Sequence, residues 1–174
     1  MNIFLLRHGI AVDPSKYGAG RDSERPLLPK GRRRLLQIAR AMAALKLNFD
    51  LIVSSPYVRA RQTAEIVAKS LKRQKQFKFS DALTPDGNPK LLIQQLNDLQ
   101  PQPENLLLVG HEPYMSRFTA LLTAGNTSME IDLKKGGLCQ LEVEELRYGR
   151  CATLVCLIAP RHLVLMAENV RLGD

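Results

Sequence analysis

The sequence predicts an α/β fold, with three α/β/α layers around a largely parallel, mixed central sheet and an antiparallel hairpin at one side. Three short apolar runs lack alternation, as strands buried on both faces do: residues 3–6, 51–53 and 106–109. Each run is followed by apolar residues at helical spacing. The length of 174 residues is typical of one domain, which we expect to span residues 1–174.

Three helices are predicted after these strands. Their apolar positions, three and four residues apart, fall within residues 35–45, 60–71 and 115–122. Pro56 and Pro113 stand where the second and third helices are expected to start, because proline's fixed φ and missing N–H cost nothing in a first turn. Ser55 is the expected N-cap of the second helix.

The rest of the chain gives weaker patterns. Residues 77–79 predict a short strand, and Leu92, Leu96 and Leu99 predict a further helix. Residues 138–143 alternate between apolar and polar, and the apolar run 152–158 follows a turn, so the two segments predict the antiparallel hairpin. The polar segment from 13 to 25 is expected to form an irregular loop over the sheet's edge, whereas the stretch after Pro160 predicts no element.

Composition narrows the class of protein. Lys and Arg number 25 against 17 Asp and Glu, and this net charge of +8 favours phosphorylated or polyanionic partners. The apolar runs are far shorter than the roughly 18 residues of a membrane span, and the N-terminus resembles no export signal, so we expect a cytoplasmic protein with no membrane contact. The three cysteines (Cys139, Cys151 and Cys156) form no metal-binding pair and are expected to be reduced structural thiols. Basic runs such as 30–34 are typical of solvated helix faces, so nucleic-acid binding is not expected.

Polar motifs close all three buried strands. They read Arg7-His8-Gly9, Ser54-Ser55-Pro56 and Gly110-His111-Glu112-Pro113. Because ligands of open α/β sheets bind beyond the carboxyl ends of the strands, we expect these motifs to converge, with Arg59 reaching back from the second helix. Two arginines, two histidines and two helix N-termini suit a tetrahedral dianion. The sequence therefore predicts a phosphate pocket in which one imidazole attacks phosphorus and the other stabilises the equatorial oxygens.

The same motifs resemble the histidine phosphatase (phosphoglycerate mutase-like) superfamily. Within it, the chain is similar to the SixA group of phosphohistidine phosphatases. The likeness rests on short length and on Arg-His-Gly-Ile-Ala at 7–11, Ser-Pro-Tyr-Val-Arg-Ala-Arg-Gln-Thr at 55–63, Arg-Pro-Leu at 25–27 before Gly31, Leu-Thr-Pro at 83–85 before Gly87, and Gly110-His111. These motifs occur in the same order as in the family, and the motifs at 7–9, 55–63 and 110–111 each follow a predicted strand. The likeness is therefore specific.

The resemblance implies a role for each matching residue. It implies that His8 is the nucleophile that becomes phosphorylated, and that Arg7, Arg59 and His111 form the rest of the phosphate pocket. Arg25 is carried over as a substrate-side contact. Neither a metal nor a cofactor is implied.

The chain departs from the family at the general acid. The family commonly uses a carboxylate, but the segment 81–87, where it would come, holds only Asp81 and Asp86 as stand-ins. Protonating the leaving alkoxide of a phosphate ester raises the rate roughly a hundredfold. The leaving group of phosphohistidine is a neutral imidazole once the other ring nitrogen is protonated. The missing glutamate therefore favours phosphohistidine as the substrate.

The sequence thus predicts a metal-independent phosphatase, a hydrolase that acts on phosphohistidine of a signalling phosphoprotein, such as a histidine phosphotransfer domain, through a phosphorylated His8. One alternative is a broader phosphatase of phosphoserine, phosphothreonine or small esters. A mutase needs lid segments that keep water from the phosphoenzyme, and this short chain offers few insertions for them. Another alternative is a non-catalytic module that binds phosphate or nucleic acid. The presence of both His8 and His111 argues against this alternative.

Overall fold

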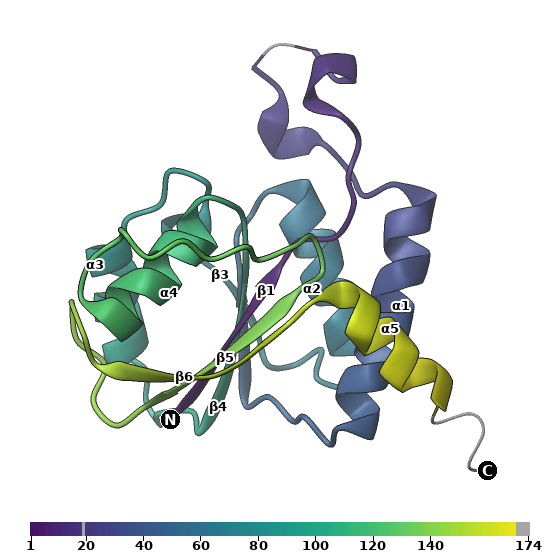
Figure 1. Cartoon of the computed structure of the whole chain (residues 1–174). Coiled ribbons are helices and arrows are strands. Elements are labelled where there is room, and N and C mark those ends of the chain that lie inside the picture. Colours follow the sequence, from purple (N-terminus) through teal and green to yellow (C-terminus); the bar gives the residue numbers. More distant parts are fainter. Residues whose placement is uncertain (19, 170–174) are drawn as a thin grey trace.

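The computed structural model of the chain describes residues 1–18 and 20–169. Its centre is a six-stranded sheet (Figure 1) built from β1 (Asn2–Arg7), β2 (Leu51–Ser54), β3 (Phe77–Phe79), β4 (Asn105–Gly110), β5 (Leu138–Val143) and β6 (Ala152–Ile158). The strand order is β3-β2-β4-β1-β5-β6. The first four strands in this order are parallel, whereas β5 runs antiparallel to β1 and to β6. The predicted mixed sheet with a hairpin at one side is confirmed.

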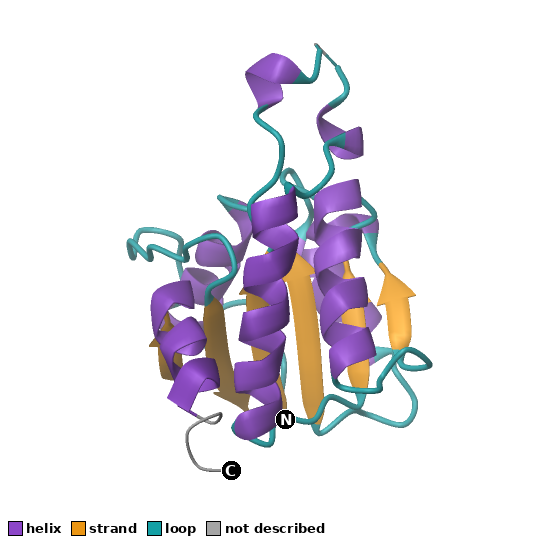
Figure 2. Ribbon diagram, turned by 90° about the vertical axis from the view of Figure 1, so that its right-hand side faces the viewer, coloured by secondary structure: helices purple, strands orange, loops and turns teal. Residues whose placement is uncertain are grey.

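Helices cover both faces of the sheet. They are α1 (Pro29–Ala44), α2 (Val58–Ser70), α3 (Pro89–Asn97), α4 (Tyr114–Ala124) and α5 (Pro160–Asn169). The helices α1, α2 and α5 pack on one face, and α3 and α4 lie on the other (Figures 1 and 2). Neighbouring residues of β1 point into opposite layers: Phe4 and Leu6 into the core with α1, and Ile3 and Leu5 into the core with α4. Burial on both faces explains why the sequence of β1 shows no alternation.

The expected helix starts are wrong by one or two residues. The N-cap of α2 is Tyr57, and α4 is capped by Pro113 itself, so neither Pro56 nor Pro113 is a first helical residue. Ser55 does not cap α2, because its Oγ lies 2.8 Å from the His111 ring and accepts only the Tyr57 N–H, at 3.3 Å. A hydroxyl that a distant histidine engages cannot be recognised from local spacing.

Two other segments differ from expectation. The segment 13–25 does not follow the sheet's edge: it rises beyond the carboxyl ends of the strands and forms the projection at the top of Figures 1 and 2. It contains two single-turn helices, η1 (Pro14–Lys16) and η2 (Asp22–Glu24). The stretch after Pro160 forms α5, which packs on α1 through the buried Leu163 and Ala167.

The predicted free thiols are confirmed, because none of the three cysteines is in a disulfide. Burial raises the pKa of the Cys139 thiol to about 12, as expected of a structural thiol inside a core. None of the described helices combines the length and the apolar character that a bilayer crossing requires.

Candidate active site

The pairing of β1 with β4 sets the two histidines side by side. Arg7 aligns with Gly110 in the parallel register, and the His8 N–H continues the ladder by donating to the Gly110 carbonyl at 3.0 Å. His111 directly follows the end of β4, and the centroids of the His8 and His111 rings are 5.1 Å apart. The predicted meeting of strand ends is therefore present in the fold, with Ser55 joining it through its N–H to the Val109 carbonyl.

Hydrogen bonds orient the His8 ring for attack through Nε2. Its Nδ1 lies 2.7 Å from the Gly9 carbonyl, which only accepts, so Nδ1 carries the proton and Nε2 keeps its lone pair. The Arg59 Nε donates toward that lone pair at 3.3 Å. The tautomer assigned by these contacts leaves Nε2 as the basic, nucleophilic nitrogen.

Gly9 and Thr63 fix the turn that carries His8. A Cβ on Gly9 would lie 2.6 Å from the Leu35 side chain of α1, so a larger residue there would require Leu35 to move. The Thr63 Oγ1 accepts the Gly9 N–H at 3.1 Å and donates to the Arg59 carbonyl at 2.7 Å. Thr63 therefore ties the turn after β1 to the first turn of α2.

His111 presents a buried ring nitrogen that has no partner among the described residues. Because the Ser55 Oγ accepts from the Tyr57 N–H, its own proton is free to donate to His111 Nε2, 2.8 Å away. Nδ1 then keeps the ring proton, and this buried atom has no partner among the described residues. A buried donor without an acceptor is unfavourable, so an oxyanion oxygen placed here would be stabilised.

Both imidazoles are neutral near neutral pH. Burial, with smaller contributions from Arg59 and Arg7, lowers the pKa of His8 to about 3, even though its hydrogen bond to Gly9 opposes the shift. Burial and the neighbouring His8 lower the pKa of His111 to about 2. A neutral His8 is the form that can act as a nucleophile.

The two arginines flank the histidines. The side chain of Arg59 is 3% exposed and lies over the Tyr57 ring, 5.2 Å from its centroid. Arg7 donates through Nη1 to the Leu133 carbonyl at 2.9 Å, and its buried Nε has no partner in the described chain. Burial lowers the pKa of both guanidiniums from the ordinary arginine value. Four of the five predicted site residues, Arg7, His8, Arg59 and His111, thus lie together at the strand ends.

The projecting segment adds a residue that the sequence did not indicate. Asp22 binds Arg59 twice, accepting from Nη1 through its carbonyl (2.6 Å) and from Nη2 through its carboxylate (2.8 Å). Arg25 donates through Nε to the same carboxylate at 2.8 Å, so the fifth predicted residue reaches the site through Asp22. Burial alone would raise the pKa of Asp22, but the hydrogen bonds from Arg25 and Arg59 lower it. The only sequence signal for Asp22 is its position three residues before Arg25.

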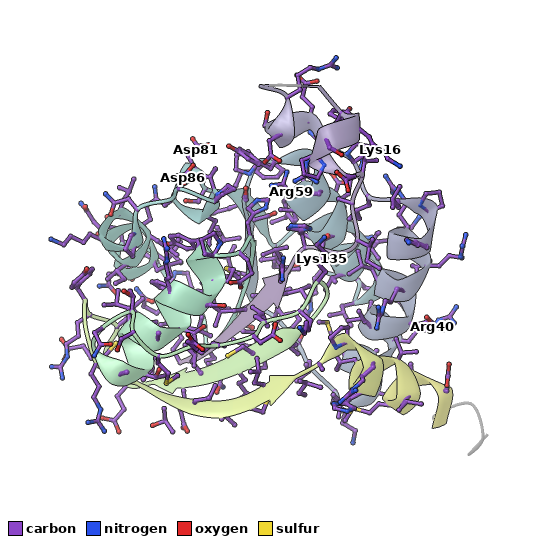
Figure 3. The ribbon with its side chains drawn as sticks, turned by 45° about the horizontal axis from the view of Figure 1, so that its top comes forward. Lys16, Arg40, Arg59, Asp81, Asp86 and Lys135 are labelled. Atoms are coloured by element: carbon purple, nitrogen blue, oxygen red, sulfur yellow. The ribbon has the colours of Figure 1, made fainter. Side chains whose placement is uncertain are left out.

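The two expected stand-ins for the general acid lie apart from this cluster. Asp81 and Asp86 are exposed on the α3 side, and Figure 3 shows both separated from Arg59. Glu112, directly after His111, is partly buried, and burial raises its pKa. Its carboxylate accepts from the Ser116 hydroxyl at 2.5 Å. Among the described residues, no contact joins any of these three carboxylates to His8.

This arrangement and the comparisons with known proteins agree on the class. The sequence model of the histidine phosphatase superfamily (branch 1) matches residues 3–84. Phosphohistidine phosphatase SixA of Escherichia coli K12 is 30% identical over 128 residues, which cover 73% of this chain and 77% of that protein. The chain belongs to the histidine phosphatase superfamily, and this membership supports phosphatase activity, a hydrolase reaction.

A second relative in sequence and a solved structure show the same similarity to the SixA group. The SixA homolog of Haemophilus influenzae is 32% identical over 130 residues, covering 70% of this chain and 77% of that protein. The structure of the protein histidine phosphatase SixA complexed with tungstate superposes with a TM-score of 0.79 and 26% identity, covering 94% of this chain and 99% of that chain. The predicted likeness to the SixA group is confirmed.

The Asp22 carboxylate occupies Arg59, so we expect it to compete with an anion that binds there. In the Asp22→Asn variant we expect inorganic phosphate to bind about fivefold more tightly, because a like charge beside the anion is removed. Isothermal titration calorimetry measures the affinity. Glu24→Gln is the matched control, because Glu24 in the same turn pairs with the exposed Arg21 alone. Unchanged or weaker phosphate binding by Asp22→Asn would contradict the competition.

The neutral histidines also make stability depend on pH. The pKa of histidine in the unfolded chain is about 6.5, whereas the pKa of folded His8 is about 3 and that of His111 is about 2. Between the folded and the unfolded pKa values, the unfolded state therefore binds more protons. We expect the free energy of unfolding to fall as pH is lowered below 6.5, by up to about 1.4 kcal/mol per pH unit for each histidine. Urea unfolding at pH 7 and pH 5 measures this. A His8→Gln, His111→Gln double variant should show a shallower decrease, and an identical decrease would refute the assignment.

Proposed function

We infer that the protein is a phosphohistidine phosphatase, in which His8 takes the phosphoryl group from a phosphohistidine of a phosphoprotein and passes it to water. The observation that carries the proposal is the His8 ring itself. Its Nδ1 is bound to the Gly9 carbonyl, its pKa is lowered to about 3, and its Nε2 faces Arg59. These features describe a neutral imidazole whose unprotonated nitrogen lies in a cationic pocket.

The first half of the reaction transfers phosphorus between two imidazoles. Nε2 of His8 attacks phosphorus in line while the P–N bond of the substrate breaks, and the substrate histidine leaves as neutral imidazole with a proton on its other nitrogen. Arg7, Arg59 and the Nδ1–H of His111 bind the equatorial oxygens, whose charge builds up in the transition state. Binding of the phosphoryl group by Arg59 displaces the Asp22 carboxylate from Nη2.

The second half returns the enzyme to its starting form. A water molecule attacks phosphorus, the bond to Nε2 of His8 breaks, and inorganic phosphate leaves with the protons of the water, while His8 keeps its proton on Nδ1. No metal takes part in either half of the proposed reaction. Tungstate is a tetrahedral oxyanion like phosphate, and its complex with the SixA relative supports a pocket for such an anion here.

The choice of phosphohistidine over an ester rests on the leaving group. Asp81 and Asp86 are exposed and separated from Arg59, so neither carboxylate is in place to protonate an alkoxide. Neutral imidazole needs no such help. The names of the two SixA relatives support the same substrate class. We extend the proposal to a cytoplasmic signalling protein as the phosphorylated partner.

A substrate panel tests this function. Phosphate release is measured from a phosphohistidine-bearing phosphotransfer domain, a phosphoserine peptide and a set of small phosphate esters, all with EDTA present. We expect rapid release from phosphohistidine alone, unaffected by EDTA. Release mainly from esters would make the protein a general phosphatase with an unrecognised acid, and no release would favour a phosphate-binding module.

A further inference from the structure

Next to the phosphate pocket lies a second hollow whose polar lining is cationic. This basic pocket has a volume of about 550 Å³, and its cations are Arg7, Arg34, Lys134, Lys135 and Arg161. They come from the end of β1, from α1, from the loop before β5 and from the start of α5. Arg7 is shared with the candidate active site, so the two pockets adjoin. Figure 3 shows Lys135 between Arg59 and the start of α5.

The charge of the basic pocket is largely uncompensated. Among the described residues, no acidic side chain lines it and only Lys134 forms an ion pair, with Asp132 at 2.5 Å. Arg161 donates to His162, whereas Arg34 and Lys135 have no ion pair within the described residues. Burial, Arg7 and Arg25 together lower the pKa of Lys135, and Lys135 in turn acts on His8. Gathering like charges costs folding free energy, which a bound anionic partner would recover.

The cationic surface also extends away from the active site. A neighbouring pocket of about 510 Å³ shares Arg34 and Arg161 with the first and adds Lys30 and Arg33, with Glu168 as its acid. A second phosphate on a small metabolite would fill only the part beside Arg7. The two adjoining pockets instead match several carboxylates spread over a protein surface. The planar guanidinium of arginine can donate two parallel hydrogen bonds to one carboxylate.

We propose that the basic pocket docks acidic side chains of the phosphoprotein substrate, so that the enzyme selects phosphohistidines that lie in an acidic surface. This inference rests on the proposed function for its substrate. The docking contacts change the rate of association and the affinity for the substrate, and they do not change the rate of the chemical step. Selectivity for acidic surroundings should therefore appear in KM and weaken as salt is raised.

The test compares two double variants of equal charge change. Arg34→Glu with Arg161→Glu reverses two pocket cations outside the catalytic cluster. Arg40→Glu with Lys69→Glu reverses two exposed cations that do not line the basic pocket, and Figure 3 shows Arg40 on α1 well away from Lys135. Each protein is assayed on two phosphohistidine peptides that differ only in having glutamate or glutamine around the phosphohistidine, and on phosphohistidine as the free amino acid.

We expect the wild type and the control to prefer the glutamate peptide. The pocket variant should lose about tenfold in kcat/KM on that peptide, through KM, while hydrolysing free phosphohistidine normally. Equal peptide preference in the pocket variant and the wild type would overturn the proposal, as would an equal loss on both peptides.

A binding measurement separates this inference from the proposed function. Fluorescence anisotropy with the unphosphorylated glutamate peptide needs no catalysis, and it should show weaker binding to the pocket variant than to the control. If this difference appears without any phosphohistidine hydrolysis, the proposed function fails and the docking surface stands. Tighter binding of a DNA duplex than of the glutamate peptide, lost in the pocket variant, would make nucleic acid the partner and refute the inference.

Discussion

Replacing His8 with alanine is expected to reduce kcat on a phosphohistidine substrate by about 10⁴-fold or more, because removing a covalent nucleophile leaves only binding and charge stabilisation. The side chain is buried and its hydrogen bonds are to the Gly9 carbonyl and Arg59, so its loss removes no bond that joins strands. Circular dichroism and thermal unfolding should show a folded variant. Initial rates of phosphate release give the size of the effect.

The control for this result is the exposed histidine on α5. His162 lies outside the candidate active site, so His162→Ala should hydrolyse free phosphohistidine at the wild-type rate. If His8→Ala retained normal turnover while folded, the covalent mechanism would be wrong. Loss of turnover in both variants would point to damage to the protein instead of to the chemistry.

Replacing Arg59 with alanine is expected to cost about 3 to 4 kcal/mol of transition-state stabilisation, which decreases kcat/KM by roughly 10² to 10³. Removing a preorganised hydrogen-bond donor from an active site has a cost of this size. The guanidinium is buried and lies beside Nε2 of His8, where the transferred group must pass. Arg59→Lys should recover only part of the loss, because an ammonium cannot bind two oxygens in a planar fork. Steady-state kinetics on the phosphohistidine peptide measure both variants.

A second variant separates catalysis from packing at this position. Arg59→Ala leaves the Asp22 carboxylate with Arg25 as its remaining partner, so the loss of an ion pair also contributes. In an Asp22→Asn, Arg59→Ala double variant, the charge of Asp22 is gone while the phosphoryl group still lacks Arg59. A double variant as active as the wild type would show that Arg59 serves folding alone.

The fold was predictable where each element carries its own signal. The strands β1, β2 and β4 are covered on both faces, so each contains an uninterrupted apolar run, whereas β5 shows the alternation of a strand with one polar face. The helix α5 was not predicted, because its buried face is defined by contact with α1, which lies more than a hundred residues earlier in the chain.

The candidate site was predictable to the extent that strand ends determine it. Parallel pairing brings Arg7, His8 and His111 together whatever the loops do, and the helix after β2 adds Arg59. The contact of Asp22 with Arg59 and that of Ser55 with His111 depend on how a loop and a hydroxyl lie in space. Neither contact follows from a periodic pattern, so neither could be assigned from the sequence.

The most direct test of the account is to identify the phosphorylated atom of the enzyme. The wild-type protein is mixed with a phosphohistidine-bearing phosphotransfer domain and quenched within milliseconds in alkali, where phosphohistidine survives, and the enzyme is analysed by mass spectrometry and phosphorus NMR. Because Nδ1 is held by the Gly9 carbonyl, the account predicts phosphate on His8 at Nε2. Phosphate on another residue or on Nδ1, or turnover with no phosphorylated enzyme at any time point, would contradict it.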